Sequence, residues 1–465
     1  MLSNYPVFQY AFSMDLGNIF RAYDVRGIYP SEINEAVAQR IAQAGAQFLN
    51  AKTMAVGRDV RLSSPRLEKA VIDGLISAGV DVMEIGAVPT ELLYFAVGYY
   101  NLGGGIQVTA SHNPAQFNGL KFIGEGVKAL SEEDGLQEIR HFADSDRRFD
   151  AERDGEVHSR NVEEAYFDFL TQFCSFDNGR KLKIVANNNF GLSGPVVERL
   201  LKRLASDHIQ LIKLNFEPNG TFPDGPPNPL LEKVQRQTRV QLLEHQADFA
   251  VMWDADGDRC MLMDERGEVI ENCHLTALLA VYLLKENPGS KIIHDPRNVW
   301  AVDEAVKSSG GVPLVNRAGH AFIKHRMREE GALFAGETSG HFYFRDFFFA
   351  DSGIIPFLLF LNIVANSDQK VSELFAHLRA KYPVSGEINF EFEDNYKVVE
   401  EARKRYIKGE IDNTDGLSVS YKNWRFNLHV ANTENRLRLN VEAHDKWTLQ
   451  AKTDELVTLI KSLSA

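Results

Sequence analysis

The chain has 465 residues, which is too many for one ordinary hydrophobic core, so we expect two to four domains. Hydrophobic residues make up 44% of it and charged residues 25%, a balance typical of a soluble globular protein. The formal net charge of −13 would repel nucleic acids and anionic membranes, so neither is expected as a partner.

Cysteine spacing and apolar runs exclude further classes. The three cysteines lie far apart without a CxxC pair, which argues against a disulfide framework or zinc site and fits a reducing cytoplasm. The first residues show no signal-peptide pattern, and the longest apolar run, 354–365, is too short to cross a bilayer. We therefore expect a soluble cytoplasmic protein in which 354–365 is a buried helix.

The first third of the chain alternates strand-like and helix-like segments. Helical patterns alternate with short apolar runs, the helices at 32–49, 65–78 and 91–100 and the strands at 54–56, 80–85 and 105–109. Short buried strands between such helices indicate βαβ units and a parallel or mixed sheet. The pattern restarts at 183–185 and at 291–294, so we predict three related mixed α/β domains.

The alternation of strand-like and helix-like segments ends after residue 366. Strand-like runs at 384–392, 417–421, 425–430 and 436–443 surround helical patterns at 395–408 and 453–463. Strands grouped around two helices predict a small C-terminal α+β domain. The acidic stretch 142–155 is the best linker candidate. The expected domains are 1–150, 151–253, 254–368, which begins with an acidic loop, and 369–465.

That acidic loop is the first chemistry-bearing cluster. Asp254, Asp256 and Asp258 follow the strand-like run 249–253, and their period of two puts them on one side of an extended or looped backbone. Like charges this close need compensation, and ligands that are all oxygen favour Mg²⁺ or Ca²⁺ over zinc. An EF-hand is rejected because its sixth position, which requires glycine, is Arg259. A solvated acidic turn is the alternative interpretation.

Ser111 lies in the segment TASHNP, directly after the strand-like run 105–108. A serine at a strand end can be presented as a nucleophile, and His112 and Asn113 could position it or its phosphate. A plain turn before proline is the alternative. Lys121, ten residues on, could act as a general acid/base or as a counter-charge to phosphate, although a surface lysine is the simpler interpretation when it is taken alone.

Two further groups of residues suit a sugar phosphate, one through its hydroxyls and the other through its phosphate. In the segment GETSGH, Glu337, Ser339 and His341 stand at alternate positions and suit adjacent sugar hydroxyls, with a satisfied turn as the alternative. Arginine suits bidentate phosphate contacts, although each cation alone is most often a surface charge. The candidate cations are Arg21, Arg26, Arg58, Arg61, Arg259, Arg297, His320 and Lys324. No Walker loop is present in the sequence.

Taken in order, five segments closely resemble the α-D-phosphohexomutase superfamily, particularly its phosphomannomutase/phosphoglucomutase members. They are FRAYDVRG at 20–27, TASHNP at 109–114, DADGDR at 254–259, GETSGH at 336–341 and NTEN at 432–435. The resemblance implies four domains around a central active-site cleft. It also implies an isomerase that interconverts hexose 1-phosphate and hexose 6-phosphate, mannose and/or glucose, through a phosphoserine and a 1,6-bisphosphate.

The same resemblance implies roles for individual residues. Ser111 would carry the phosphate and, with Asp254, Asp256 and Asp258, would hold Mg²⁺. Lys121 and Arg21 would lie beside the transferring group, with His112 and Arg259 close by. Glu337 and Ser339 would contact the sugar 3- and 4-hydroxyls. The remaining substrate-binding residues would be Tyr23, Arg297, His320, His341, His429, Asn432 and Thr433. A hexose 1,6-bisphosphate would serve as activator, and the oligomeric state, monomer or dimer, stays open.

One departure separates this chain from the family pattern. The loop of the last domain usually reads Arg-Ser/Ala-Ser-Asn-Thr and binds the phosphate that is not transferred, whereas here it reads His429-Val-Ala-Asn-Thr. Arg297 also replaces a lysine that many relatives carry. The altered loop keeps two alternatives open: a sugar-bisphosphate synthase or phosphatase that uses the same phosphoserine chemistry, and a non-catalytic sugar-phosphate-binding protein.

Overall fold

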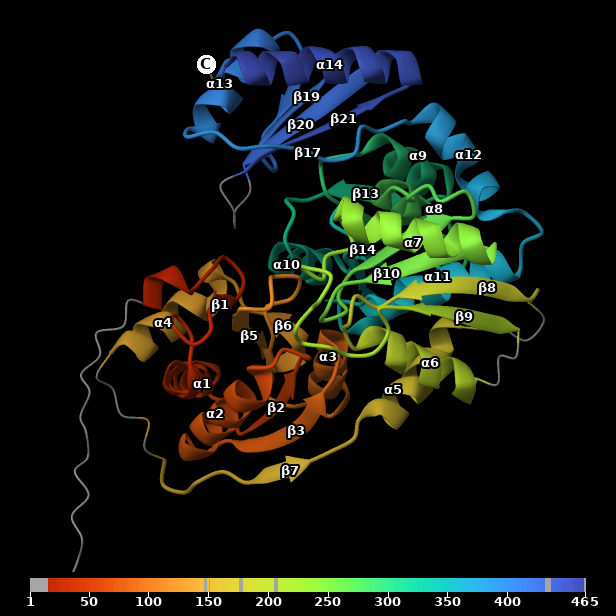
Figure 1. Ribbon diagram of the computed structural model, residues 1–465. Helices are drawn as coiled ribbons and strands as arrows, with labels where there is room; N and C mark the ends of the chain where they lie inside the picture. The colour runs from red at the N-terminus through yellow and green to blue at the C-terminus, as the bar shows by residue number, and fades with distance from the viewer. Residues whose placement is uncertain are drawn as a thin grey trace, which may run out of the picture.

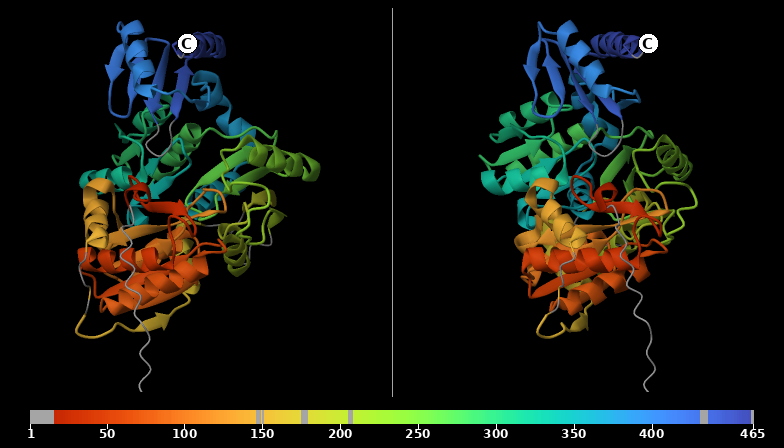
Figure 2. Two further views of the ribbon diagram at one scale, coloured as in Figure 1. Left: turned by 60° about the vertical axis from the view of Figure 1, so that its left-hand side comes forward. Right: turned by 90° about the vertical axis from the view of Figure 1, so that its left-hand side faces the viewer.

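The fold is that of a computed structural model, which describes residues 16–145, 149, 151–174, 179–204, 208–430 and 436–463. These residues form four sheets, arranged in chain order from the red first domain to the blue last domain (Figure 1). In both turned views the last domain lies at one end of the molecule and the first domain at the other (Figure 2). The predicted series of three α/β domains and a smaller α+β domain is confirmed.

The first sheet has the strand order β1-β5-β4-β2-β3-β7, with β6 beside β5. Its strands are β1 (Val25–Ile28), β2 (Thr53–Arg58), β3 (Asp81–Ala87), β4 (Gly104–Val108), β5 (Phe117–Gly124), β6 (Lys128–Ala129) and β7 (Val157–Ser159). Its helices are α1 (Glu35–Leu49), α2 (Ser64–Ser77), α3 (Thr90–Tyr99) and α4 (Gln137–Asp144). Every residue of β4 is buried because α1 and α2 cover one face of the sheet and α3 covers the other. β7 pairs with β3, so this sheet continues beyond the boundary expected at residue 150.

The second sheet, β11-β10-β8-β9, carries the acidic loop. Its strands are β8 (Leu182–Asn187), β9 (Ile209–Leu214), β10 (Phe249–Trp253) and β11 (Cys260–Asp264), and its helices are α5 (Glu163–Leu170), α6 (Ser193–Arg203) and α7 (Glu232–His245). β10 and β11 form an antiparallel hairpin in which Trp253 pairs with Cys260. The boundary expected at 253/254 therefore falls inside this hairpin, and the acidic loop belongs to the second sheet and does not begin the third domain.

The third sheet has the order β13-β12-β14-β15-β16. Its strands are β12 (Lys291–His294), β13 (Val312–Val315), β14 (Phe334–Gly336), β15 (Phe342–Phe344) and β16 (Ala350–Asp351). Its helices are α8 (Asn272–Leu284), α9 (Trp300–Ser308), α10 (His320–Glu330), α11 (Ile354–Ala365) and α12 (Val371–Lys381). α11 is the buried helix predicted at 354–365. α12 packs against α8, so the expected boundary at 368/369 comes before the third domain ends.

The last domain is an antiparallel sheet of order β17-β21-β20-β19-β18 with two helices. Its elements are β17 (Ile388–Phe390), α13 (Asn395–Arg405), β18 (Glu410–Asp412), β19 (Leu417–Ser420), β20 (Trp424–Val430), β21 (Leu437–Ala443) and α14 (Lys446–Ser462). α14 begins seven residues before the predicted start at 453, because the Asp445 side chain accepts a hydrogen bond from the Thr448 N–H and caps the helix. The strand predicted at 384–392 is shorter, and β18 was not predicted.

Apolar packing divides the molecule unequally. One hydrophobic core runs through α3, the second sheet, α8 and α11, so the first three domains share it. The last domain has a core of its own. Among the helices of the described residues, none combines the length and apolar character needed to span a bilayer. The three cysteines are free thiols, as their spacing predicted.

Candidate active site

Ser111 occupies a left-handed backbone conformation immediately beyond β4, with φ +50°. Its residue surface is 3% exposed. The Ser111 N–H donates to Thr109 Oγ1 over 2.9 Å, and its Oγ lies 3.0 Å from His112 Nδ1. A non-glycine residue in this region is strained and persists only when its surroundings hold it. The contacts around the loop after β4 therefore hold Ser111 in this conformation and fix the position of its hydroxyl.

The acidic loop of the β10–β11 hairpin faces that hydroxyl. Asp254, Asp256 and Asp258 are buried, and each offers a carboxylate oxygen, all within 4.8 Å of one another. Ser111 Oγ donates to Asp254 Oδ2 over 3.4 Å. Burial, followed by the carboxylates of Asp258 and Asp256, raises the pKa of Asp254 well above its usual value. The sequence pattern predicted the acidic cluster, and the family resemblance implied its position beside Ser111.

These residues fit a hard divalent cation. Asp256 Oδ1 and Asp258 Oδ1 are buried without a hydrogen-bond partner in the described residues, so each has an oxygen available for a metal. Gly257, with φ +75°, makes the turn between the two side chains, and a Cβ there would lie 2.0 Å from Ser193 Oγ. A set of only oxygen ligands suits Mg²⁺ or Ca²⁺ and not zinc. The acidic loop can therefore hold the magnesium ion that the sequence predicted.

Lys121 projects from β5 into the same cluster. Its Nζ lies 3.0 Å from Asp256 Oδ2 and 2.7 Å from Asp258 Oδ2, and the side chain is almost fully buried. Burial opposes the ammonium form, but Asp256 and Asp258 outweigh it and raise the Lys121 pKa well above its usual value. Lys121 is therefore a fixed positive charge in this arrangement, and the alternative of a surface lysine is excluded.

Of the two arginines that flank Tyr23-Asp24, Arg26 reaches this site. Arg26 donates from Nε to Asp24 over 2.8 Å and from Nη1 to Asn113 Oδ1, in the Ser111 loop, over 2.7 Å. Burial opposes its charge, but Asp24 and then the acidic loop raise its pKa. Arg21 is exposed and precedes β1. The catalytic role of Arg21 stays a prediction, whereas Arg26 lies on β1, the strand that pairs with β5.

The GETSGH segment joins the acidic loop from the third domain. His341 Nε2 lies 3.4 Å from Asp258 Oδ1, while its Nδ1 lies 2.8 Å from Ser339 Oγ and 3.4 Å from Glu337 Oε2. Burial lowers the pKa of His341, but Asp258 and Glu337 together raise it to about 9. Glu337 also accepts the Gly319 N–H over 2.7 Å. These three side chains lie together on one side, as their alternate spacing predicted, and His341 places them beside the acidic loop.

The other predicted residues lie around this centre. Arg259 Nε is 3.6 Å from Asp254 Oδ2, and burial followed by the nearby arginines lowers the pKa of His112 well below its usual value. The Tyr23 and His320 rings meet edge to face at 5.3 Å, and burial lowers the His320 pKa. These contacts come from three domains.

The last domain meets the third domain through Asp415. Asp415 lies 3.1 Å from His429 Nδ1 and 3.6 Å from Arg297 Nη2, and Arg297 also lies 3.5 Å from Asp295. Asp295 accepts the Thr338 N–H over 2.5 Å, so this chain of contacts reaches the GETSGH segment. The predicted Asn432 and Thr433 lie outside the described residues.

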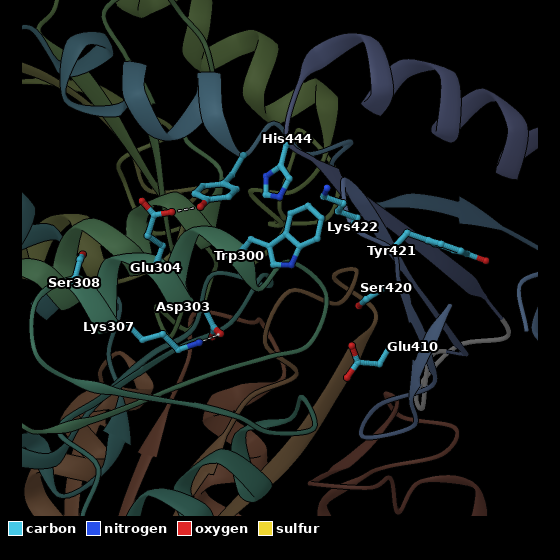
Figure 3. A pocket seen from close by; sticks show the side chains of 11 residues that line it. Trp300, Asp303, Glu304, Lys307, Ser308, Glu410, Ser420, Tyr421, Lys422 and His444 are labelled. Carbon is cyan, nitrogen blue, oxygen red and sulfur yellow. Dashed lines mark hydrogen bonds and ion pairs between the residues drawn. The ribbon is translucent and has the colours of Figure 1, made fainter. Parts of the chain in front are cut away.

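A separate cavity of about 750 Å³ lies where α9 meets the last domain (Figure 3). Trp300 and His444 stack there with ring centroids 4.3 Å apart. It is lined by Trp300, Asp303, Glu304, Lys307, Ser308, Tyr382, Glu410, Ser420, Tyr421, Lys422 and His444. No predicted site residue within the described part of the chain lines this cavity, so it belongs to the junction between the two domains.

Comparisons with known proteins agree with this arrangement. Family models described as phosphoglucomutase/phosphomannomutase α/β/α domains I, II and III match residues 17–148, 164–267 and 272–382. The chain is 42% identical to a phosphomannomutase of Escherichia coli K12 over 95% of this chain and 98% of that one. It is 40% identical to a protein named phosphohexose mutases of Xanthomonas campestris pv. campestris B100, over 95% and 99% of the two chains.

Solved structures share the whole fold. A phosphoglucomutase/phosphomannomutase family protein of Burkholderia thailandensis superposes with a TM-score of 0.86 at 29% identity, covering 96% of this chain and 97% of that one. A putative phosphomannomutase of Thermus thermophilus superposes with a TM-score of 0.80 at 22% identity, over 95% and 98%.

The four-domain fold and the serine, lysine and aspartate arrangement define a phosphohexomutase, an isomerase that moves a phosphoryl group on a hexose. This class of enzyme is metal-dependent, and the three aspartates of the acidic loop lie close enough together to hold an ion. The chain belongs to the phosphoglucomutase/phosphomannomutase family within the α-D-phosphohexomutase superfamily.

Proposed function

We propose that this mutase interconverts the 1- and 6-phosphates of mannose and glucose by way of phospho-Ser111. The observation that carries the proposal is the 3.4 Å contact between Ser111 Oγ and Asp254, beside two further aspartates and Lys121. Phosphoryl transfer requires positioning and compensation of negative charge more than covalent help from the protein. The acidic loop, with a bound cation, and the buried lysine and arginine supply both.

Each site residue then has a defined task. Asp254, Asp256 and Asp258, with an oxygen of phospho-Ser111, would hold Mg²⁺, which supplies positive charge against the transferring phosphoryl group. Lys121 and Arg26 provide fixed cations at the same group, and we assign to Arg26 the task that the sequence suggested for Arg21. Glu337 and Ser339 orient the sugar through its 3- and 4-hydroxyls. Mannose and glucose differ at C2, so a site that contacts only those hydroxyls accepts both.

The reaction is two transfers with one intermediate. The free sugar hydroxyl attacks the phosphorus of phospho-Ser111, the P–O bond to Ser111 Oγ breaks, and the hydroxyl proton ends on Ser111 Oγ. The product is a hexose 1,6-bisphosphate, which reverses its orientation within the site so that its other phosphate faces Ser111. Its other phosphate returns to Ser111 by the reverse of the same step. Added bisphosphate therefore acts as an activator, because it phosphorylates enzyme that has lost its phosphate.

The altered loop of the last domain favours a second candidate. His429 stands where the family pattern has arginine, and Asp415 occupies one of its ring nitrogens. A weaker hold on the intermediate would release it and leave Ser111 without phosphate. A sugar-bisphosphate synthase would then regain the Ser111 phosphate from a second phosphorylated donor, and a phosphatase would transfer the Ser111 phosphate to water. A non-catalytic sugar-phosphate-binding protein is the remaining alternative from the sequence.

Two measurements test the proposal. Intact mass before and after phosphatase treatment should reveal one labile phosphate, which Ser111→Ala abolishes. When the protein is incubated with mannose, glucose or glucosamine 1-phosphate, Mg²⁺ and a trace of 1,6-bisphosphate, it should convert the mannose and glucose phosphates to their 6-phosphates. Net release of phosphate or of bisphosphate would establish the second candidate, and isomerisation of glucosamine phosphate alone would overturn the substrate assignment. A protein without labile phosphate and without turnover would be a binding protein.

A further inference from the structure

Arg61 lies beneath the loop that carries Ser111, and its side chain is 0% exposed. Its Nη2 donates to the backbone oxygens of Ser111 and Asn113, both over 2.7 Å. Its Nη1 donates to the backbone oxygens of Pro114 over 2.7 Å and Phe117 over 2.9 Å. One guanidinium therefore binds four carbonyl groups of residues 111–117, the segment that leads from the Ser111 loop to the first residue of β5.

Asp59 completes the arrangement from the other side. Its Oδ2 accepts from Arg61 Nε over 3.0 Å and from Thr109 Oγ1 over 2.8 Å. Its Oδ1 accepts from the Arg61 N–H over 3.0 Å and from Ser64 Oγ over 2.5 Å. Thr109 Oγ1 in turn accepts the Ser111 N–H over 2.9 Å. The backbone of Ser111 is thus held at its N–H through Asp59 and Thr109, and at its carbonyl through Arg61.

The donor count decides what Arg61 does. A guanidinium has five N–H donors, and Arg61 directs one to Asp59 and four to the loop carbonyls. It has none left for a phosphate, although the sequence pattern made it a phosphate-binding candidate. Burial also lowers its pKa in spite of Asp59, which is consistent with a structural cation sealed from water. Apart from the contact with Asp59, the side-chain hydrogen bonds of Arg61 all reach the backbone of residues 111–117.

The second domain covers Arg61. The Phe222 ring lies 5.0 Å from the Arg61 guanidinium carbon, and Gly220 forms a β-bridge with Arg61. A Cβ on Gly220 would lie 2.1 Å from the Val60 oxygen, so only glycine permits this approach. The segment from 219 to 222 therefore keeps water away from the hydrogen bonds of Arg61, which strengthens them.

We propose that Arg61 and Asp59 are positioning residues that hold Ser111 in its left-handed conformation, so that Ser111 Oγ faces Asp254 of the acidic loop. The proposal rests on the proposed function, in which Ser111 accepts the phosphoryl group. Without the pair, the strained loop relaxes and the nucleophile moves away from the acidic loop. A displacement of about 1 Å at a reacting atom lowers a rate by roughly 100-fold.

The test uses the full chain and three variants. Thr109→Val removes the acceptor for the Ser111 N–H together with the hydroxyl that donates to Asp59. Arg61→Lys retains the charge and Arg61→Gln removes it. The readouts are the rate at which glucose 1,6-bisphosphate phosphorylates Ser111, followed by intact mass, and kcat and KM with hexose 1-phosphate. We expect Arg61→Gln and Thr109→Val to lower the phosphorylation rate and kcat together by about 100-fold and about 10-fold, with KM nearly unchanged. Arg61→Lys should restore part of the loss.

Glu68→Gln is the matched control. Glu68 on α2 pairs over 2.8 Å with Arg58, the last residue of β2, and its hydrogen bond is to that side chain, so Glu68→Gln should have the kinetics of wild type. Wild-type phosphorylation rates in both Thr109→Val and Arg61→Gln would overturn the inference. So would losses that track the folded fraction measured by circular dichroism. If the wild-type Ser111 takes up no phosphate, the proposed function fails first, and the two failures are thus distinguished.

Discussion

Cations of this protein differ in function according to the donors that remain after their structural contacts. Arg61 uses all of its donors on the protein. Arg26 directs Nε and Nη2 to Asp24 and Nη1 to Asn113, which engages all three of its nitrogens but not all five of its N–H donors. Lys121 is matched by two aspartates, which hold it as an ammonium. The same donor count can be applied at position 429, where the family pattern has a guanidinium and this chain has an imidazole.

His429→Arg should lower KM for hexose phosphate. Asp415 already occupies one donor of the imidazole, whereas a guanidinium would pair with Asp415 and keep further donors for phosphate. A recovered charge-assisted contact is worth roughly 2 kcal/mol, or about a thirtyfold decrease in KM. Steady-state kinetics measure it, and His429→Gln, which adds no charge, is the control. An unchanged KM in the arginine variant would mean that the phosphate binds elsewhere.

Glu91→Gln should stabilise the protein at alkaline pH. Glu91 on α3 is fully buried and accepts a hydrogen bond from the Ser352 hydroxyl, and burial raises its pKa from 4.5 to about 8. The folded protein therefore keeps a proton that the unfolded chain releases, so stability falls as pH rises from about 4.5 to about 8.

Urea unfolding at pH 5 and pH 8.5 measures this effect. Each pH unit within the window costs wild type about 1.4 kcal/mol at most, and glutamine abolishes that dependence. The difference in unfolding free energy between variant and wild type should therefore increase with pH. An equal difference at both values would show that Glu91 is ionised in the folded protein.

At the scale of elements, the β10–β11 hairpin carries three buried aspartates and turns at Gly257, which has φ +75°. Gly257→Ala should lower Mg²⁺ affinity and activity, because its Cβ would lie 2.0 Å from Ser193 Oγ and the loop must move. The left-handed conformation adds about 1 kcal/mol of strain. Calorimetric titration with Mg²⁺ measures the affinity.

Gly289→Ala is the control that separates the steric clash of an added Cβ from the strain of a left-handed backbone. Gly289 has φ +80° and no heavy atom within 4 Å of an added Cβ, so alanine there introduces the strain alone. Gly289→Ala should lower the melting temperature through the same backbone strain that Gly257→Ala introduces, but it should leave Mg²⁺ binding unchanged. Equal Mg²⁺ affinity in both variants would show that the hairpin conformation does not control the metal site.

The elements also show what sequence can and cannot predict. The βαβ alternation and the buried helix at 354–365 were predictable because apolar period and length are local properties. Ser111 and Asp254, 143 positions apart, were predicted together only because their motifs resemble a known family. The choice between Arg21 and Arg26 depended on which residue falls in the strand paired with β5, and the role of Arg61 depended on a loop 50 residues away. Such pairings appear only in the folded chain.

The whole molecule consists of a three-domain body and a last domain attached mainly by polar contacts. Arg425 of the last domain donates to the backbone oxygens of Pro296 over 2.8 Å and Arg297 over 3.1 Å. Glu442 pairs with Arg425 over 2.8 Å and accepts the Val299 N–H at the start of α9 over 2.8 Å. The pair thus fixes the backbone of Arg297, whose side chain contacts Asp415.

Glu442→Gln should loosen this junction without unfolding the rest of the protein. It leaves Arg425, whose side chain is 3% exposed, as a buried charge without its partner and removes a negative charge from the start of α9. Breaking a buried ion pair in this way costs about 3–5 kcal/mol, which falls on the domain junction and not on the shared core of the first three domains. Differential scanning calorimetry should therefore show an early transition of the last domain, separated from the main one.

Trp300 provides a second readout of the same change. It stacks on His444 across the junction, so loosening should alter its fluorescence. Glu400→Gln is the control, because Glu400 forms an exposed pair with Arg403 within α13, and such pairs contribute at most about 1 kcal/mol. If the last domain closes on the sugar phosphate, Glu442→Gln should also raise KM more than it lowers kcat. A thermogram that superimposes on that of wild type would show that the apolar contacts at the junction suffice.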